Sequence, residues 1–350
     1  MKISSPIIIL PLLFVLIVVV FLFLFLSAKM PNQNNNGFVR TWLPDYVSPL
    51  DTQKMDFPIK HISGATIGQL YFSGNDPRWV VVTSHSLDVV DTLLFAIEQT
   101  PSLSAPNITI DSPNVYMYAS SISFFIAGRT DTSFLDTLRL LTPQFTRFAQ
   151  MSPDKLLIRG LDSTLTKQVF SQIDCQTGRI LKQAEIIASQ SDGGFGADGY
   201  LRFDPASQYA FFVQTFQNRF FCIDSNLNIK YTGSTIDTLS TNSAAIEVVK
   251  QKDKIKLMST TPRQMVNKDC FVGNGFLFVV SSLRADNESL KDYNKHTTVD
   301  LYKITDGQYF GSFFIPNLDN GKAIEMKVFN DLLVVLYPKG RVATFQLNIN

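Results

Sequence analysis

The chain has 350 residues, and its 31 Lys and Arg against 30 Asp and Glu give a formal net charge of +1, which provides no electrostatic basis for nucleic-acid binding. Hydrophobic residues make up 45% and charged residues 17%, below the roughly 25% charged content of ordinary chains, which excludes an intrinsically disordered protein. Three Cys without a Cys-x-x-Cys pair argue against a disulfide framework, a zinc ribbon and a thioredoxin-like redox site.

The N-terminus carries a long apolar run from Ile7 to Leu26, interrupted only by Pro11, with no charge between Lys2 and Lys29. As a helix this run is roughly 30 Å long, the thickness of a bilayer core. We therefore predict that residues 1–30 form an N-terminal transmembrane anchor. A cleaved signal peptide is the alternative, because the run ends in small residues, but its apolar core exceeds the usual ~7–15 residues. Cleavage would release a secreted protein.

Basic residues flank the apolar run on both sides, so the positive-inside rule does not fix its orientation. Because a long domain after a single N-terminal span is usually translocated, we expect a single-pass protein of the cell membrane with its domain outside the cytoplasm, in the periplasm or on the cell surface. Residues 31–37 are polar and Asn-rich, which predicts a flexible tether, and residues 38–350 form the predicted globular domain.

From Phe38 onward, apolar runs of four to eight residues alternate with Asp, Asn, Gly, Ser and Pro, which is typical of β-strands. Several runs share one template, in which a turn leads into an apolar strand, a short loop and a second strand. The clearest copies begin at Met151 and Phe203. The first strands of six such copies begin near residues 75, 119, 152, 204, 273 and 329.

The mean spacing of about 51 residues is close to that of four-stranded propeller blades, about 40–50 residues. The sequence thus predicts an all-β, six-bladed β-propeller behind a single transmembrane helix. Seven blades are the alternative, because the interval from 204 to 273 is long enough to hold a degenerate blade. We instead assign 232–269 to the end of one blade and an inserted excursion with one strand, Ser243–Lys250.

The segment Asp300–Pro316, together with Phe203-Asp204-Pro205, resembles the six-bladed TolB-like and NHL-like β-propeller proteins of bacterial envelopes. The resemblance covers residues 60–348 and rests on structural motifs. It implies a propeller fold and a binding role in the cell envelope. It implies no catalytic residues, because that superfamily contains binding proteins and unrelated enzymes alike.

The segment Gly194-Phe-Gly-Ala-Asp-Gly199 matches a phosphate-binding pattern, but a strand rather than a helix is expected after it. We interpret it as a loop that enters the inner strand of a blade. Such a loop can line the mouth of the central channel, which makes Asp192 and Asp198 candidate contacts for a ligand or Ca²⁺.

His85 lies next to Ser84, Ser86 and Asp88, the residue types of a hydrolase triad, but near neighbours rarely form that geometry and the chain has no Gly-x-Ser-x-Gly elbow. We keep His85 as a candidate ligand contact. Three arginines complete the set of candidates: Arg129, Arg159 and Arg284. The three cysteines read as small buried residues, with a disulfide as the open alternative: Cys175, Cys222 and Cys270.

These observations favour a membrane-anchored, non-enzymatic propeller that binds an envelope protein or a small-molecule ligand. No cofactor or metal-ligand set is identified, and no nucleic-acid partner is expected. The alternative is an envelope enzyme or small-molecule sensor with a composite site at the propeller axis, where polar residues from several blades leave no local motif. That alternative predicts that at least three of the six candidates converge on the axis.

Overall fold

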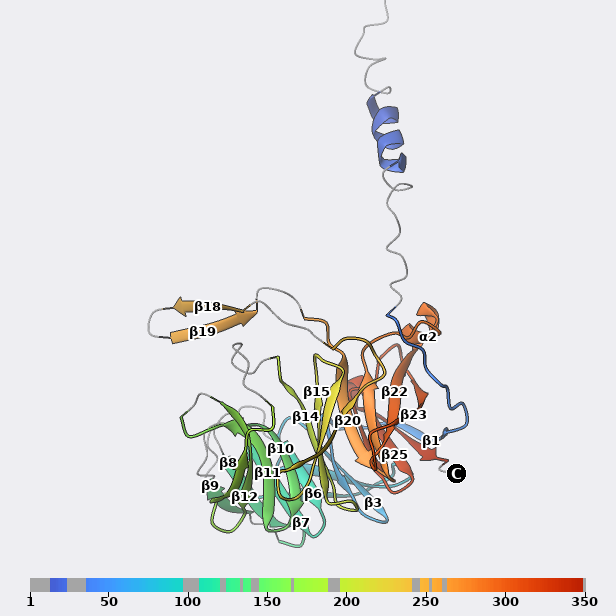
Figure 1. Cartoon of the computed structure of the whole chain (residues 1–350). Helices are drawn as coiled ribbons and strands as arrows, with labels where there is room; N and C mark the ends of the chain where they lie inside the picture. The colour runs from blue at the N-terminus through green and yellow to red at the C-terminus, as the bar shows by residue number, and fades with distance from the viewer. Residues whose placement is uncertain are drawn as a thin grey trace, which may run out of the picture.

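The computed structural model describes residues 13–23, 36–96, 107–119, 124–132, 135–139, 145–164, 167–187, 196–240, 246–251, 254–259 and 263–348. In these residues the regular structure is almost entirely antiparallel β-sheet (Figure 1). Four separate sheets have four strands each, and an eight-stranded sheet consists of two four-stranded halves. The halves meet at a single parallel bridge between Gly64 and Ile110. A Cβ on Gly64 would lie 1.9 Å from the Ile110 carbonyl oxygen, so this close approach requires glycine.

The strands follow the chain sheet by sheet. The first half of the large sheet contains β2 (His61–Ala65), β3 (Gln69–Ser73), β4 (Trp79–Ser84) and β5 (Val89–Leu94). The second half contains β6 (Asn107–Asp111), β7 (Asn114–Ala119), β8 (Phe124–Arg129) and β9 (Leu135–Arg139). The next sheet contains β10 (Phe145–Ser152), β11 (Lys155–Leu161), β12 (Gln168–Asp174) and β13 (Ile180–Ala184). The sheet after it contains β14 (Gly199–Asp204), β15 (Tyr209–Gln214), β16 (Arg219–Ile223) and β17 (Ile229–Ser234).

The last two sheets complete the series. One contains β20 (Asn267–Gly273), β21 (Phe276–Ser281), β22 (His296–Lys303) and β23 (Tyr309–Pro316), with the short helix α2 (Leu290–Lys295) between β21 and β22. The other contains β24 (Glu325–Phe329), β25 (Leu332–Tyr337) and β26 (Arg341–Leu347), and its fourth strand is β1 (Val47–Lys54) from the N-terminal side of the domain. Both ends of the domain therefore share one sheet.

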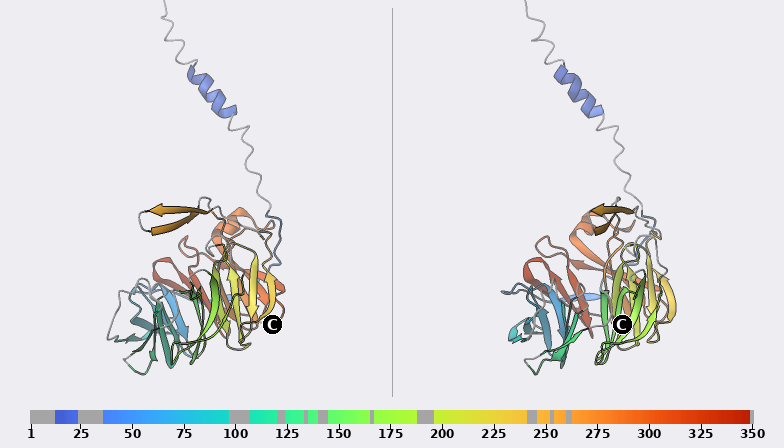
Figure 2. Two further views of the ribbon diagram at one scale, coloured as in Figure 1. Left: turned by 60° about the vertical axis from the view of Figure 1, so that its left-hand side comes forward. Right: turned by 90° about the vertical axis from the view of Figure 1, so that its left-hand side faces the viewer.

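The first strand of each four-stranded unit lies next to first strands of neighbouring units: β2 contacts β6 and β24, and β14 contacts β10 and β20. The sheets radiate from these inner strands like the blades of a propeller (Figures 1 and 2). We use the word blade for each four-stranded unit.

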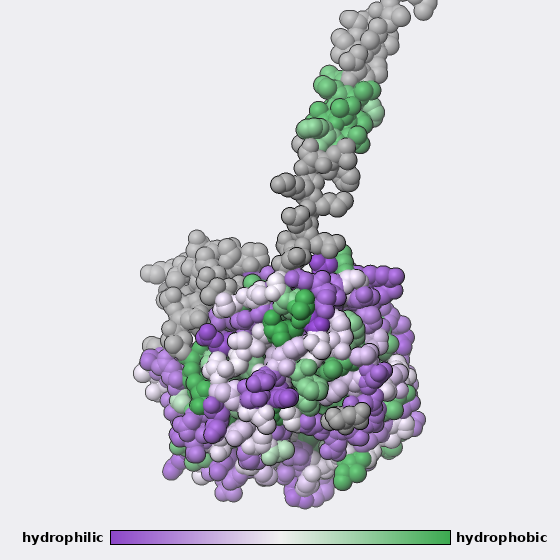
Figure 3. All heavy atoms as spheres, turned by 45° about the vertical axis from the view of Figure 1, so that its right-hand side comes forward, coloured by the Kyte–Doolittle hydropathy of each residue, from purple (hydrophilic) through white to green (hydrophobic). Residues whose placement is uncertain are grey.

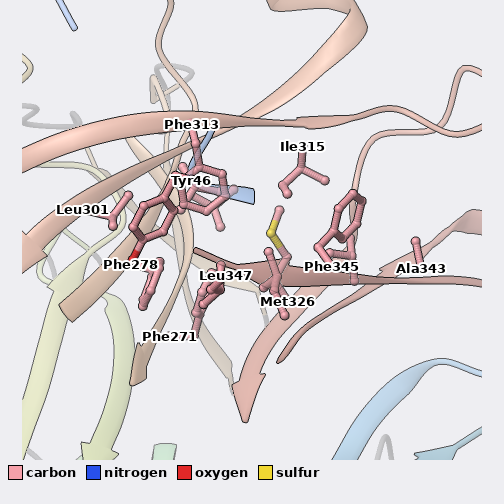
Figure 4. Close-up of a cluster of buried hydrophobic side chains, with 14 of the residues drawn as sticks. Tyr46, Phe271, Phe278, Leu301, Phe313, Ile315, Met326, Ala343, Phe345 and Leu347 are labelled. Atoms are coloured by element: carbon pink, nitrogen blue, oxygen red, sulfur yellow. The ribbon is translucent and has the colours of Figure 1, made fainter. Parts of the chain in front are cut away.

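Large buried clusters lie between neighbouring blades rather than within them. The cluster between the last two blades joins Phe271, Phe278 and Phe313 to Met326 and Phe345 (Figure 4). Equivalent clusters fill the other blade interfaces in the described part of the chain. Middle strands such as β25 are buried at every position, which explains why their sequences are apolar on both faces.

Two details differ from the sequence predictions. The copies predicted near 75 and 119 correspond to third strands, β4 and β8, whereas the other four correspond to second strands. Second and third strands are both apolar runs after turns, so the pattern alone does not separate them. The predicted excursion forms a two-stranded hairpin, β18 (Ile246–Gln251) with β19 (Lys254–Ser259), and thus holds two strands rather than one.

A helix spans residues 13–23 within the predicted anchor, and its apolar side chains are exposed (Figure 3). Across the described residues, no helix is both long enough and apolar enough to cross a bilayer. The remainder of the Ile7–Leu26 run lies outside the described residues, so the anchor stays a prediction.

Residues 36–43, which we call the N-terminal strap, lie along the blade formed by β20–β23. Leu43 N–H donates to the Ser312 carbonyl (2.8 Å), and Trp42 forms a parallel bridge with Ser312. Asn36 and Gly37, which the sequence places in the tether, donate their backbone N–H groups to the Asp286 carboxylate at 2.7 and 3.1 Å. The folded domain therefore begins slightly before residue 38.

Candidate functional site

A cavity of about 490 Å³ lies among the inner strands, and every one of β2, β6, β10, β14, β20 and β24 contributes to its lining. We call it the axial cavity. Three of these strands contribute their first residue, namely His61, Asn107 and Glu325, so the cavity lies towards the end of the domain where the inner strands begin. Because β20 and β21 are antiparallel, β21 ends beside the start of β20. The connection that follows β21 contains Asp286, which binds the strap, so the strap is attached at the same end of the domain as the axial cavity.

Charged side chains of the cavity tie neighbouring blades together. Arg202 of β14 donates from Nη2 to Asp269 Oδ1 (2.6 Å) and from Nε to the Cys270 carbonyl (2.7 Å), both in β20. Asp269 also accepts from the Cys270 N–H (2.8 Å). A charge-assisted pair with backbone contacts at both ends fixes the distance between the two inner strands.

The preceding blade pair repeats this arrangement. Arg147 of β10 donates from Nη2 to Asp198 Oδ2 (2.7 Å) and from Nε to the Gly199 carbonyl, while Asp198 accepts from the Gly199 N–H (2.9 Å). The sequence carries a signal for this arrangement that was not among the predicted site residues: Thr146-Arg147-Phe148 and Leu201-Arg202-Phe203 contain the same Arg-Phe pair on successive inner strands.

A lysine forms the corresponding tie between the last blade and the first. Lys327 Nζ donates to the Ile62 carbonyl, and Glu325 accepts from the Ile62 N–H (3.2 Å). His61 Nδ1 lies 3.4 Å from the same carboxylate. Burial disfavours ionisation of Glu325, but Lys327, His61 and the Ile62 N–H outweigh it and lower the pKa of Glu325 to about 2.

The side of the cavity formed by the second, third and fourth blades is aromatic. The Tyr118 and Phe148 rings stack with centroids 4.1 Å apart. The Arg147 guanidinium carbon lies over the Tyr200 ring, 5.8 Å from its centroid. Burial raises the pKa of Tyr118 and of Tyr200, so both hydroxyls stay neutral in the physiological range. This side offers flat apolar surfaces for stacking.

The opposite side holds two lysines that have no carboxylate partner among the described residues, Lys60 and Lys268. Lys60 is exposed at the start of the inner strand of the first blade, and Lys268 is half-buried at the start of β20. Burial, together with repulsion from Lys322, lowers the pKa of Lys268. The cavity thus has an aromatic half and a half with excess positive charge.

The cavity continues outward into a second hollow of about 870 Å³ that is lined by the connector Pro58–His61 and by residues 337–340. Both spaces share Lys60, His61, Asn107 and Ile324 in their lining. Ile324 is 57% exposed, so this hollow gives the axial cavity an approach from solvent.

Two of the candidates predicted from sequence lie together. Arg159 Nη1 is 3.7 Å from Asp198 Oδ1, and the guanidinium lies 5.0 Å from the centre of the Phe212 ring. Arg159 is only 2% exposed, and its Nε and Nη2 atoms have no hydrogen-bond partner. Burial lowers the pKa of Arg159 to about 10, although Asp198 opposes the shift. Neither residue lines the axial cavity.

The other described candidates lie apart from this pair. Arg129 forms an exposed ion pair with Asp131 (2.7 Å), and Arg284 uses its carbonyl to accept from Asn36 in the strap. His85 Nε2 lies 3.1 Å from the Thr66 carbonyl oxygen, so its ring is oriented by backbone rather than by a carboxylate as a triad requires. Asp192 lies outside the described residues.

Neither a metal cluster nor a disulfide occurs among the described residues. No group of three or more His, Cys, Asp or Glu side chains there could hold a metal ion. Cys222 and Cys270 are buried in one cluster and Cys175 is half-buried; all three are free thiols. Burial raises the pKa of each thiol, to about 11 for Cys222 and about 12 for Cys175 and Cys270, so they are weak nucleophiles.

Comparisons with known proteins give similarity at the level of fold. No family model matches the chain, and no curated protein matches it. A member of the DUF4221 family from Bacteroides vulgatus has a TM-score of 0.51 at 12% identity, covering 87% of this chain and 98% of its own. A protein of unknown function from Bacteroides thetaiotaomicron has a TM-score of 0.50 at 12% identity, covering 86% and 75%. Together with the radiating sheets, these similarities identify a β-propeller fold.

Proposed function

We propose that this protein is a six-bladed propeller that acts as a non-catalytic binding module, with the axial cavity as its binding site. The observation that carries the proposal is the cavity itself, because all six inner strands contribute side chains to one space of about 490 Å³, a size typical of small-molecule sites. In the described residues there are six four-stranded units, and the long interval after residue 204 contains the β18–β19 hairpin in addition to strands of the fourth unit; both observations favour six blades. The TolB-like and NHL-like envelope propellers are the class to which we assign it.

The chemistry of the cavity favours binding over catalysis. Arg202 and Lys327 are already engaged in ties between blades, and Glu325 is held by Lys327 and His61. Groups fixed in this way hold the cavity in shape, and a preformed cavity binds ligand without a large ordering cost.

We further propose that the propeller is tethered to the cell membrane by Ile7–Leu26 and lies outside the cytoplasm. Two observations support the tether: residues 13–23 are helical with exposed apolar side chains, and Asn36 is hydrogen-bonded to the end of the domain where the axial cavity lies. The membrane and the cavity would then be on the same side of the domain.

Carbonate extraction tests the tether. We expect the full-length protein to stay in the membrane pellet and a variant with Leu16→Lys and Val20→Lys to enter the supernatant, because each charge in the apolar run costs about 2.5–3.5 kcal/mol on insertion scales. The matched control, Asn34→Lys with Asn35→Lys, adds the same charge outside the run and should stay in the pellet. Extraction of the unmodified protein would contradict the proposal.

Site-specific photo-crosslinking tests the binding site. Benzoylphenylalanine is placed at Ile324, which lines the cavity, or at Ile229, an exposed isoleucine of similar accessibility on the outer strand β17. In native membranes we expect a discrete adduct from position 324 only, whether small molecule or protein. Equal labelling from both positions, or labelling from position 229 alone, would place binding elsewhere and reject the axial site.

A further inference from the structure

We propose that the axial cavity binds a small organic anion, with its ring against the aromatic half and its carboxylate or phosphate group beside Lys60 and Lys268. This inference rests on the proposed binding function and assigns its ligand a chemical class. It follows from the distribution of charge and aromatic surface within the cavity.

The charge balance is the first argument. Five cationic or titratable basic side chains line the cavity against two carboxylates: Lys60, His61, Arg202, Lys268 and Lys327 against Asp269 and Glu325. Asp269 is paired with Arg202, and Glu325 with Lys327 and His61. Lys60 and Lys268 therefore have no anionic partner within the described residues, although the whole chain is nearly neutral.

The position of Lys268 is the second argument. Lys268 is half-buried, and burial together with the like charge of Lys322 lowers its pKa. Lys322 is itself fixed away from the cavity, with Nζ donating to the Tyr293 carbonyl (3.0 Å) and lying 4.3 Å from the Tyr293 ring centre. Burial of an unpaired charge is unfavourable, and an anionic ligand would relieve it.

The aromatic half of the cavity is the third argument, because it favours a ligand that contains a ring over an inorganic ion. The stacked Tyr118–Phe148 pair, Tyr200 and Phe203 face the same space as the lysines. An inorganic ion would leave this apolar surface wet, whereas a planar or sugar ring would cover it. The volume of the cavity suits one such ring with its substituents.

The experiment compares two fluorescent probes that differ only in charge, 7-methoxycoumarin-3-carboxylate and its 3-carboxamide. Binding to the full-length protein in detergent is followed by fluorescence anisotropy, with empty micelles subtracted. We expect the carboxylate to bind about tenfold more tightly than the carboxamide, because contacts to charged groups are stronger than neutral ones. Citrate, an anion without a ring, should compete only weakly.

Three variants locate the contacts. Lys60→Gln with Lys268→Gln should abolish the preference for the carboxylate, because the affinity for the carboxylate falls about tenfold, towards that of the carboxamide. Phe148→Leu should weaken both probes about fivefold through lost stacking. Lys182→Gln, an exposed lysine on the outer strand β13, is the control and should bind as the parent does. Thermal unfolding verifies each fold; the midpoint of the double lysine variant should equal or exceed that of the parent, because the substitutions remove charges that have no partner.

Equal affinity for both probes, a carboxylate preference that survives the double lysine substitution, or no binding at millimolar probe concentration would each overturn the anion assignment. A crosslinked neutral ligand at position 324 would overturn it as well, while leaving the axial binding function intact. Absence of any adduct at position 324 would instead reject the proposed function itself, so the two failures are distinguishable.

Discussion

Arg202 and Asp269 show how single residues hold this ring together, because each makes both an ion pair and a backbone contact. In a double-mutant cycle with Arg202→Gln and Asp269→Asn, we expect a coupling of about 1–2 kcal/mol in the free energy of unfolding. The exposed Arg129–Asp131 pair is the matched control and should show no measurable coupling. The measurement is urea unfolding of the four proteins in each cycle. Equal coupling in both pairs would contradict a special role for the Arg202–Asp269 tie between the blades.

Glu325 makes stability depend on pH. Its pKa is lowered to about 2 in the folded protein, so its ionised form stabilises the fold above the ordinary glutamate pKa. That contribution, about 2–3 kcal/mol, should be lost as the pH falls from about 5 to 2. The measurement is the difference in unfolding free energy between the parent and Glu325→Gln across this range. A difference that does not change with pH would refute the assignment.

The residues of the axial cavity were harder to predict than the strands around it. Asp198 was a candidate because it lies in the glycine-rich segment that ends at Gly199, and it does lie beside the candidate Arg159, but neither residue lines the axial cavity. Lys60, Lys268 and Glu325 were missed because their neighbours come from strands far apart in sequence. Only closure of the ring brings such positions into one cavity, and no local sequence pattern encodes which residues of distant strands become neighbours.

At the scale of elements, the N-terminal strap depends on one buried arginine. Arg40 is 3% exposed, and its guanidinium contacts Asp300 at 2.7 Å and Glu288 at 2.9 Å. Phe38 and Trp42 flank it, with ring centres 5.1 and 5.9 Å from its guanidinium carbon. The sequence marked Arg40 only as one of several basic residues after the apolar run, because its two carboxylate partners are about 250 positions away.

Arg40→Met should therefore destabilise the domain by about 3–5 kcal/mol, because it leaves two carboxylates buried without their cation. The control is Arg284→Met, which removes a half-buried arginine whose backbone, rather than side chain, contacts the strap. Thermal unfolding followed by circular dichroism compares the variants. Equal loss of stability in both would show that the strap does not depend on the Arg40 contacts.

Strand positions were largely predictable, because each apolar run bounded by turn residues became a strand. The position of each strand within its blade was less predictable. Near residues 75 and 119 the template matched the third strand instead of the second, since both are buried on two faces and follow similar turns. Pairing partners, which decide the position of a strand in its blade, are set by tertiary packing.

At the scale of the whole molecule, the ring is closed by β1, which pairs with β26 from Val47–Leu347 to Lys54–Arg341. A chain truncated before Arg341 should lose cooperative thermal unfolding, because β1 would have no partner and the buried strand β25 would be exposed at an edge. A chain ending at Asn348 keeps β26 and is the control. A sharp transition at the parent midpoint in the shorter chain would contradict this view of closure.

The pairing of β1 with β26 also has a consequence for biosynthesis. Since β1 precedes all the blades in the chain and β26 belongs to the last blade, the ring cannot be completed until β26 has been made. If an N-terminal anchor enters the membrane first, the first and last blades must wait in an open form while the remaining residues cross. In that case the ring would close only after translocation, and β1 would stay an unpaired edge strand until β26 arrives.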